Sequence, residues 1–193
     1  MGTTQPIRNL QDIQRMKNYF LEKGQIRNYA MITLALNTSL RIGDLLHLRW
    51  EDVYSFDRDE FREHIQIVEQ KTKKTTQILI NQEARHALLR LKMAANERIS
   101  SEIYIFKSRN GGNRPISRSR AFVIVRSAAC DLGFEGIIGC HSLRKTFGYQ
   151  AWKKGVPPAL IMSIYNHSSI EITKRYLAIE QDDKDDVFSK MNL

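Results

Sequence analysis

Cysteine is scarce in this chain: Cys130 and Cys140 are the only two among 193 residues. Two thiols are too few for a disulfide framework or for a zinc site of four thiolates. We therefore expect both to be small buried side chains in a reducing cytosol. No apolar run approaches the length of a membrane span, and no basic segment followed by an apolar one opens the chain. The sequence thus predicts a cytoplasmic protein with no membrane partner.

Acidic residues are outnumbered, because 21 Asp and Glu face 30 Lys and Arg, for a formal net charge of +9. Such an excess favours a polyanionic partner such as nucleic acid, although it says little about the fold. Hydrophobic residues make up 42% of the chain, which is typical of a globular protein. The length suits one good-sized domain or two small ones.

Apolar residues recur at helical spacing along most of the chain, as at Leu10, Ile13, Met16 and Phe20. The exception is a stretch of two short β-type runs around the sequence KTKK, which predicts a hairpin over 63–70 and 75–80. No internal repeat or linker is visible. The pattern predicts an α+β fold, mainly α-helical with a small antiparallel β-sheet.

Helix-start signals follow one another closely in the last third of the chain. Ser142 is expected to cap a helix that runs to Gly155, and Ser168 with Glu171 forms a capping-box pattern for a helix over 169–179. His141 and His167 would then lie at or just before helix N-termini, where unpaired N–H groups attract anions. Arg144 and Lys145 add positive charge to the first of these helix starts. Cations there are unfavourable without an anion, which indicates a bound phosphate.

Two arginines, two histidines and a tyrosine suit chemistry on a phosphodiester. The guanidinium groups of Arg41 and Arg144 offer planar forks to the non-bridging oxygens and stay charged. The hydroxyl of Tyr176 is a weak nucleophile at neutral pH, since its usual pKa is about 10, so it needs positioning and proton removal. Imidazoles can accept that proton, and a lysine on the hairpin can protonate a leaving oxygen.

Each of these residues also has a structural interpretation. Arg41 suits the exposed face of an amphipathic helix, and Tyr176 shares a helical face with two isoleucines, as a buried tyrosine would. His167 could cap a helix, His141 and Arg144 could share a helix by chance, and KTKK could be a solvated hairpin tip. No single residue decides between the two interpretations.

The order of these motifs resembles that of the tyrosine recombinases, the phage integrase family. LNTSLRIGDLLHLRWEDV is similar to the first arginine box of that family, with Arg41 in the arginine position. HSLRKTFGYQAWKKG is similar to its His-x-x-Arg box, and IMSIYNHSSIEITKRYL to its closing box, in which a His or Trp precedes the tyrosine by nine residues. The resemblance runs from about residue 8 to about residue 180.

The resemblance assigns a role to each candidate residue. It implies that Tyr176 attacks the scissile phosphate while Arg41 and Arg144 clamp the non-bridging oxygens. It further implies that His141 acts as general base or acid near the tyrosine and that His167 donates a hydrogen bond to the phosphate. Lys71 falls where the family carries a catalytic lysine on a β-hairpin, and Lys73 is the next candidate. No metal or cofactor is implied.

The chain departs from the family pattern at its periphery. Asp44 stands where Glu is common, Ser39 where Gly is frequent, and YNH replaces the common LGH before the histidine of the closing box. Arg41 also comes too early for a preceding core-binding domain. We therefore expect residues 1–179 to be a catalytic domain alone, as in the short fimbrial-type DNA invertases, and 180–193 to be a tail that forms a short docking helix.

The resemblance implies site-specific recombination of double-stranded DNA: integration, excision or inversion through a 3′-phosphotyrosyl intermediate. It implies a homo-oligomer, tetrameric on a DNA synapse and monomeric or dimeric alone, near the nucleoid of a bacterial or phage-type host. Accessory DNA-bending proteins are further candidate partners. Three alternatives stay open: a type IB topoisomerase, a non-catalytic DNA-binding regulator, and a metallo-phosphodiesterase, for which clustered carboxylate ligands are lacking near the histidines.

Overall fold

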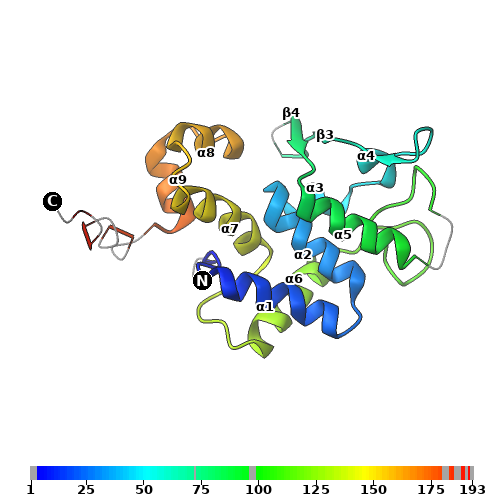
Figure 1. The fold of residues 1–193 in the computed structure, drawn as a ribbon, viewed down its shortest axis with the longest axis horizontal. Helices are drawn as coiled ribbons and strands as arrows, with labels where there is room; N and C mark the ends of the chain where they lie inside the picture. Colours follow the sequence, from blue (N-terminus) through cyan, green and yellow to red (C-terminus); the bar gives the residue numbers. More distant parts are fainter. Residues whose placement is uncertain are drawn as a thin grey trace.

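The computed structural model describes residues 4–71, 73–95, 99–179, 183–184, 188–189 and 191. The chain is mainly helical and carries two small antiparallel sheets, which confirms the expected fold class (Figure 1). In chain order the elements are α1 (Leu10–Glu22), α2 (Ile26–Thr38), α3 (Ile42–Leu46), α4 (Trp50–Val53), β1 (Tyr54–Ser55), β2 (Glu60–Phe61), β3 (His64–Val68), β4 (Thr75–Leu79), α5 (Gln82–Met93), α6 (Arg118–Asp131), α7 (Cys140–Lys153), α8 (Pro158–Tyr165) and α9 (Ile170–Leu177).

Helix α2 lies at the centre of the main hydrophobic core. All residues from 29 to 36 are buried, which is the pattern of a helix surrounded by protein on every side. Helices α1, α5 and α7 pack against it, as Figure 1 shows. Helix α1 contributes Met16 and Phe20 from its apolar face, and its first turn is capped by Asn9, whose side chain accepts a hydrogen bond from the Gln11 N–H.

A second, smaller cluster joins α7, α8 and α9. Its buried members are Ile161, Tyr165 and Leu177. The three helices can approach closely because α7 carries Gly148 at the contact: a Cβ atom there would lie 2.6 Å from both the Leu177 side chain and the Tyr165 hydroxyl. This cluster carries Tyr176 at its edge.

Two helix starts differ from the sequence prediction. Helix α7 begins at Cys140, and Ser142 lies inside its first turn, where its Oγ accepts a hydrogen bond from the Gly139 N–H at 3.1 Å. Helix α9 is capped by Ser169, which accepts from the Ile172 N–H, rather than by Ser168. This start turns Thr173 and Leu177 inward and leaves Ile172 39% exposed, so Ile172 does not share the packed face of Tyr176.

The predicted hairpin is confirmed: β3 pairs with β4, and the register runs from His64 opposite Leu79 to Val68 opposite Thr75. The helical segment expected from Arg41 is instead divided into α3 and α4. The break arises because the backbone beyond α3 pairs with a distant segment: Trp50 N–H donates to the Ile103 carbonyl at 3.0 Å. Sequence periodicity also missed the short hairpin of β1 and β2.

The prediction that both cysteines are buried is wrong for Cys130, which is exposed on α6 while its neighbours Ala128 and Ala129 face the core. Cys140 is partly buried, and this burial raises the pKa of its thiol to about 11. Within the described part of the chain, no helix combines the length and apolar character needed to cross a membrane.

Candidate active site

Arg41 lies where α2 gives way to α3, at the N-cap of α3. The chain turns there through Ser39, which adopts a left-handed backbone conformation with φ 55°. The Nη1 atom of Arg41 donates to Oε2 of Glu69 at 2.5 Å. Glu69 is only 2% exposed, and a carboxylate so buried needs a cationic partner. The pair fixes the guanidinium of Arg41 beside the loop between β3 and β4.

Arg144 reaches the same turn from α7. It is 5% exposed, and its Nη1 donates to the carbonyl oxygen of Ser39. Its guanidinium carbon also lies 4.7 Å from the ring centroid of Tyr165. The structure therefore brings the two predicted arginines together, although 102 other residues separate them in the sequence, counting from 42 to 143.

The hairpin loop that carries the candidate lysines is fixed at both ends. The Gln70 N–H donates to Oδ1 of Asp44 at 2.9 Å, and Nζ of Lys74 donates to Oδ1 of Asn166 at 3.3 Å. Lys73 has a left-handed backbone with φ 57°, which is uncommon for a lysine and marks the turn itself. Lys71 is exposed, and its charge reaches the ring of His141.

The ring of Tyr176 lies among three other rings, those of the predicted site residues His141 and His167 and that of Tyr165. Its ring centroid is 5.1 Å from that of His167, 5.2 Å from that of Tyr165 and 5.9 Å from that of His141. The Nζ atom of Lys145 lies 5.3 Å from the Tyr176 centroid. The two predicted histidines therefore meet the predicted nucleophile, with the imidazole rings set edge-on to the phenol.

The Tyr176 hydroxyl is buried, and it has no hydrogen-bond partner among the described residues. Loss of hydration raises its pKa, and the charges of Arg144 and Arg41 oppose this rise. A buried hydroxyl without a partner is unusual, because it forfeits the hydrogen bonds it had in water. The atom is thus poised to bond to a group that enters the site.

Both histidines have a pKa below the usual value of 6.5 in the free protein, which favours the neutral ring. Loss of hydration lowers the pKa of His141, although its side chain keeps some contact with solvent, and nearby positive charge lowers it further. The cations responsible are, in decreasing order, Lys145, Arg144, Arg41 and Lys71. Desolvation also lowers the pKa of His167, with smaller contributions from Arg144 and Arg41. Neutral imidazoles can accept protons, as a general base must.

The hydrogen bonds around His167 define its tautomer. The Thr173 hydroxyl donates its only proton to the Ser169 carbonyl at 3.1 Å. The same hydroxyl oxygen lies 3.1 Å from Nδ1 of His167, so Nδ1 carries the proton and donates to Thr173. The Nε2 atom of the neutral ring is therefore free of a proton, and it can donate to a phosphate only after it takes one up.

Sequence reasoning missed two residues of the site: Glu69, which binds Arg41, and Tyr165, whose ring stacks on that of His167. Lys145, expected with Arg144 as a cation at the start of α7, is buried. The Nζ atom of Lys145 donates to the Thr4 carbonyl at 2.6 Å, and burial lowers its pKa. The sequence offered one signal for Tyr165, namely that YNH replaces LGH in the closing box. Nothing in the sequence marked Glu69, because its partner lies on another element.

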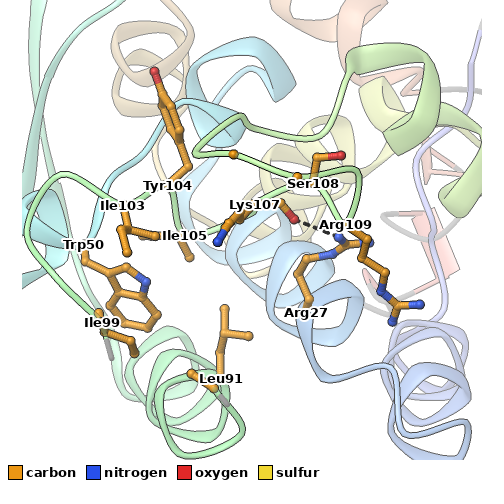
Figure 2. Close-up of a pocket in the computed structure, with 13 residues that line it drawn as sticks. Arg27, Trp50, Leu91, Ile99, Ile103, Tyr104, Ile105, Lys107, Ser108 and Arg109 are labelled. Atoms are coloured by element: carbon orange, nitrogen blue, oxygen red, sulfur yellow. Dashed lines mark hydrogen bonds between the residues drawn. The ribbon is translucent and has the colours of Figure 1, made fainter. Parts of the chain in front are cut away.

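A cavity of about 490 Å³ opens elsewhere on the molecule, between α5 and the segment 99–112 (Figure 2). Its walls include Trp50, Leu91 and Ile103, and Arg27 closes one side by donating to the Lys107 carbonyl at 2.8 Å. None of the predicted catalytic residues lines it. The chemistry of the site described above therefore does not involve this cavity.

Residues 8–182 match the family model described as the phage integrase family. The chain is 40% identical over 184 residues to the probable integrase/recombinase YoeC of Bacillus subtilis, a match that covers 94% of this chain and 93% of YoeC. It is 32% identical over 154 residues to the type 1 fimbriae regulatory protein FimE of Escherichia coli K12, covering 79% of this chain and 74% of FimE.

Solved structures show the same fold. The XerA recombinase superposes with a TM-score of 0.74 at 18% identity, over 100% of this chain and 66% of that chain. The XerH recombinase in a post-cleavage complex with palindromic difH substrate superposes with a TM-score of 0.69 at 15% identity, over 98% of this chain and 54% of that chain. The chain thus spans between half and two thirds of these two structures.

Proposed function

We propose that this chain, which belongs to the phage integrase family and is a tyrosine-type site-specific recombinase, breaks and rejoins DNA through Tyr176. The Tyr176 oxygen attacks the scissile phosphorus and forms a 3′-phosphotyrosyl bond, while the bond from phosphorus to the 5′-oxygen breaks. The 5′-hydroxyl of another strand then attacks the phosphotyrosine and releases the tyrosine. One phosphoester replaces another in each step, so the exchange consumes no nucleotide and needs no metal or cofactor.

The two arginines are suited to the negative charge that develops in this reaction. Arg41 and Arg144 converge on the turn at Ser39, and each guanidinium has five N–H donors, of which Glu69 and the Ser39 carbonyl occupy a part. The remaining donors can contact the non-bridging oxygens of a phosphate. Because the arginines are already held in place, little reorganisation is needed when the pentacovalent transition state forms.

Proton transfer falls to the histidines and the hairpin lysine. The neutral ring of His141 is the general base for the Tyr176 hydroxyl. The centroids of the two rings are 5.9 Å apart. Lys71 gives its proton to the departing 5′-oxygen, and Lys73 is the alternative donor on the same loop. His167 takes up a proton when the phosphate arrives and then donates a hydrogen bond to it through Nε2.

The observation that carries this proposal is the buried hydroxyl of Tyr176, which has no hydrogen bond of good geometry within the described part of the chain and lies beside two arginines and two imidazoles. A structural tyrosine, the other interpretation of the sequence, would ordinarily satisfy its hydroxyl inside the fold. Tyr149 shows that behaviour, since its hydroxyl donates to Oδ1 of Asp183 at 2.8 Å.

The test is a suicide substrate: nicked cognate DNA from which the cleaved fragment diffuses away and leaves the adduct trapped. Wild-type protein should give a complex that resists denaturant, and Tyr176→Phe should give none. Tyr149→Phe is the matched control and should still form it. An adduct that survives Tyr176→Phe would overturn the assignment. If the wild-type protein forms no adduct, the chain would be a DNA-binding regulator. If it forms the adduct but exchanges no strands between paired sites, it would be a topoisomerase.

DNA is the partner that this chemistry requires, and the excess of basic residues suits it. The XerH structure contains its DNA substrate. We further propose that residues 1–179 form the catalytic unit, that strand exchange occurs in a homotetramer on paired sites near the nucleoid in the cytoplasm, and that DNA-bending proteins assist the assembly. Steep loss of binding with added salt is expected, because each neutralised phosphate releases counterions.

A further inference from the structure

Tyr165 has no role in the reaction described above, yet it contacts three of its participants. Its ring stacks on that of His167, with centroids 5.4 Å apart and an interplanar angle of 30°. It lies 5.2 Å from the Tyr176 ring, tilted by 55°, and the guanidinium carbon of Arg144 lies 4.7 Å from its centroid. One side chain therefore touches a phosphate-binding arginine, a histidine and the nucleophile.

The ring of Tyr165 is itself held on several sides. The residue is 1% exposed, and its hydroxyl donates to the Arg144 carbonyl at 2.5 Å. Gly148 on α7 leaves the space that the ring occupies, because a Cβ atom there would lie 2.8 Å from Cε2 of Tyr165. Burial raises the pKa of the phenol to about 12, so this hydroxyl stays protonated at neutral pH.

Ring contacts surround Tyr176, whose hydroxyl lies near Arg144 without a hydrogen bond of good geometry to any described residue. Three rings, those of Tyr165, His167 and Tyr176, touch one another pairwise at 5.1–5.4 Å between centroids. Tyr165 is the fully buried member of the three and the one bonded to the backbone of α7. The other two rings therefore pack against a side chain that is itself fixed, and His167 is held in addition by Thr173.

We propose that Tyr165 is a positioning residue whose aromatic ring, rather than its hydroxyl, aligns Arg144, His167 and Tyr176 for attack on the phosphate. The proposal rests on the proposed function. A ring face attracts the guanidinium by cation–π interaction and gives the imidazole and phenol a flat surface of fixed direction. Leucine, which is common in the family at this position, can fill much of the same space. It supplies neither the cation–π interaction nor the flat ring surface.

The test compares Tyr165→Phe, which keeps the ring, with Tyr165→Leu, which removes it. Single-turnover cleavage of the suicide substrate, DNA affinity and the melting temperature are measured for each. Tyr165→Phe should cleave within about threefold of wild type, whereas Tyr165→Leu should be slower by about 30-fold, since a small misplacement of reacting groups costs rates of that order. DNA affinity should change by less than about threefold in both, because Tyr165 is 1% exposed and offers almost no surface to a partner.

Two further variants separate positioning from stability. Ile161→Val removes a methyl group from the same cluster without touching the rings, so it should lower the melting temperature and leave cleavage within about twofold. Gly148→Ala pushes a methyl group against the Tyr165 ring and Leu177, so it should also lower the melting temperature, but unlike Ile161→Val it should slow cleavage by about tenfold.

Equal cleavage by Tyr165→Leu and Ile161→Val would overturn the proposal, as would a loss in Tyr165→Phe as large as that in Tyr165→Leu. Normal cleavage by Gly148→Ala would overturn it as well, even where Tyr165→Leu fails to fold. These outcomes leave the proposed function intact, provided that wild-type protein still forms an adduct that Tyr176→Phe abolishes. If wild-type protein forms no adduct, or if Tyr176→Phe still forms one, the proposed function itself has failed.

Discussion

At the scale of single residues, the site gathers positive charge around a neutral phenol. Burial raises the pKa of Tyr176, and Arg144 and Arg41 counter this effect from nearby. Loss of hydration lowers the pKa of both histidines, and the same two arginines lower it further, which favours the neutral imidazoles. The free site is therefore electrostatically incomplete, and a phosphate would relieve repulsion among its cations.

The shape of the arginine side chains should matter in addition to their charge. Arg41→Lys and Arg144→Lys keep a cation but lose the planar fork, so each should slow cleavage at least about 100-fold while changing DNA affinity only a few-fold. Single-turnover cleavage and binding to an uncleavable site measure the two effects. Arg58→Lys, at a side chain that is 79% exposed, is the control and should change neither. Equal losses of binding and cleavage would point to a binding module.

DNA binding should be accompanied by proton uptake. The pKa of His167 lies below its usual value of about 6.5 in the free protein and should rise beside the phosphate to which this residue donates. A group whose pKa rises on binding takes up a proton, so affinity should increase as the pH falls from 8 to 6. His167→Gln should flatten this dependence, and His64→Gln, on the hairpin, should not. Affinity independent of pH in the wild type would contradict the expected protonation.

At the scale of elements, the β3–β4 hairpin connects the parts of the site. Its loop binds α3 through the Gln70 N–H and Asp44, pairs with Arg41 through Glu69, and reaches the end of α8 through Lys74 and Asn166. Movement of the hairpin would therefore shift Arg41 together with the candidate lysines. The loop therefore links the two candidate leaving-group acids, Lys71 and Lys73, to one of the two arginines.

A sulfur leaving group tests the role of Lys71. Lys71→Ala should cleave ordinary DNA at least about 100-fold more slowly than wild type, since general acid catalysis contributes that much. A substrate with a 5′-bridging phosphorothiolate needs no protonation, so it should restore cleavage to near the wild-type rate. Lys73→Ala is the matched variant on the same loop. Rescue of Lys73→Ala in place of Lys71→Ala would show that Lys73 is the acid.

Local sequence patterns predicted most helices and the main hairpin, whereas contacts between elements could not be predicted from the sequence. The helical repeat found α1 and α2, and alternation found the β3–β4 hairpin. The break between α3 and α4 depends on pairing of Trp50 with Ile103, which no local pattern encodes. In the site, motif order found Arg41 and Tyr176, but Glu69 and Tyr165 act through side chains that meet only after folding.

At the scale of the whole molecule, residues near the N-terminus and Asp183 near the C-terminus both contact α7. Near the N-terminus, Ile7 N–H donates to Oγ1 of Thr146 at 2.8 Å, and Arg8 Nη2 donates to the carbonyl of Ala178 at 2.6 Å, just beyond α9. Asp183, only 8% exposed, accepts from Tyr149 and lies 3.5 Å from Arg8. The helix that carries Tyr176 is thus anchored beyond its C-terminal end.

The predicted docking helix of the tail lies mostly outside the described residues, including Val187. Phe188 and Met191 are described and are 76% and 58% exposed, so they are available to a neighbouring protomer. Deletion of 185–193, which spares Asp183, should leave single-site DNA binding intact and weaken recombination between paired sites by about tenfold or more, because a bridging contact is lost. Recombination by the truncated protein at the full rate would show that the tail has no part in assembly.

The most direct measurement is identification of the residue that carries DNA. The covalent complex trapped on the suicide substrate is digested with nuclease and trypsin, and the modified peptide is sequenced by mass spectrometry. Trypsin cuts after Arg175, so the modified peptide should begin at Tyr176 and carry the nucleotide on that first residue. A nucleotide on Tyr165, on Tyr149 or on any other residue would contradict this prediction.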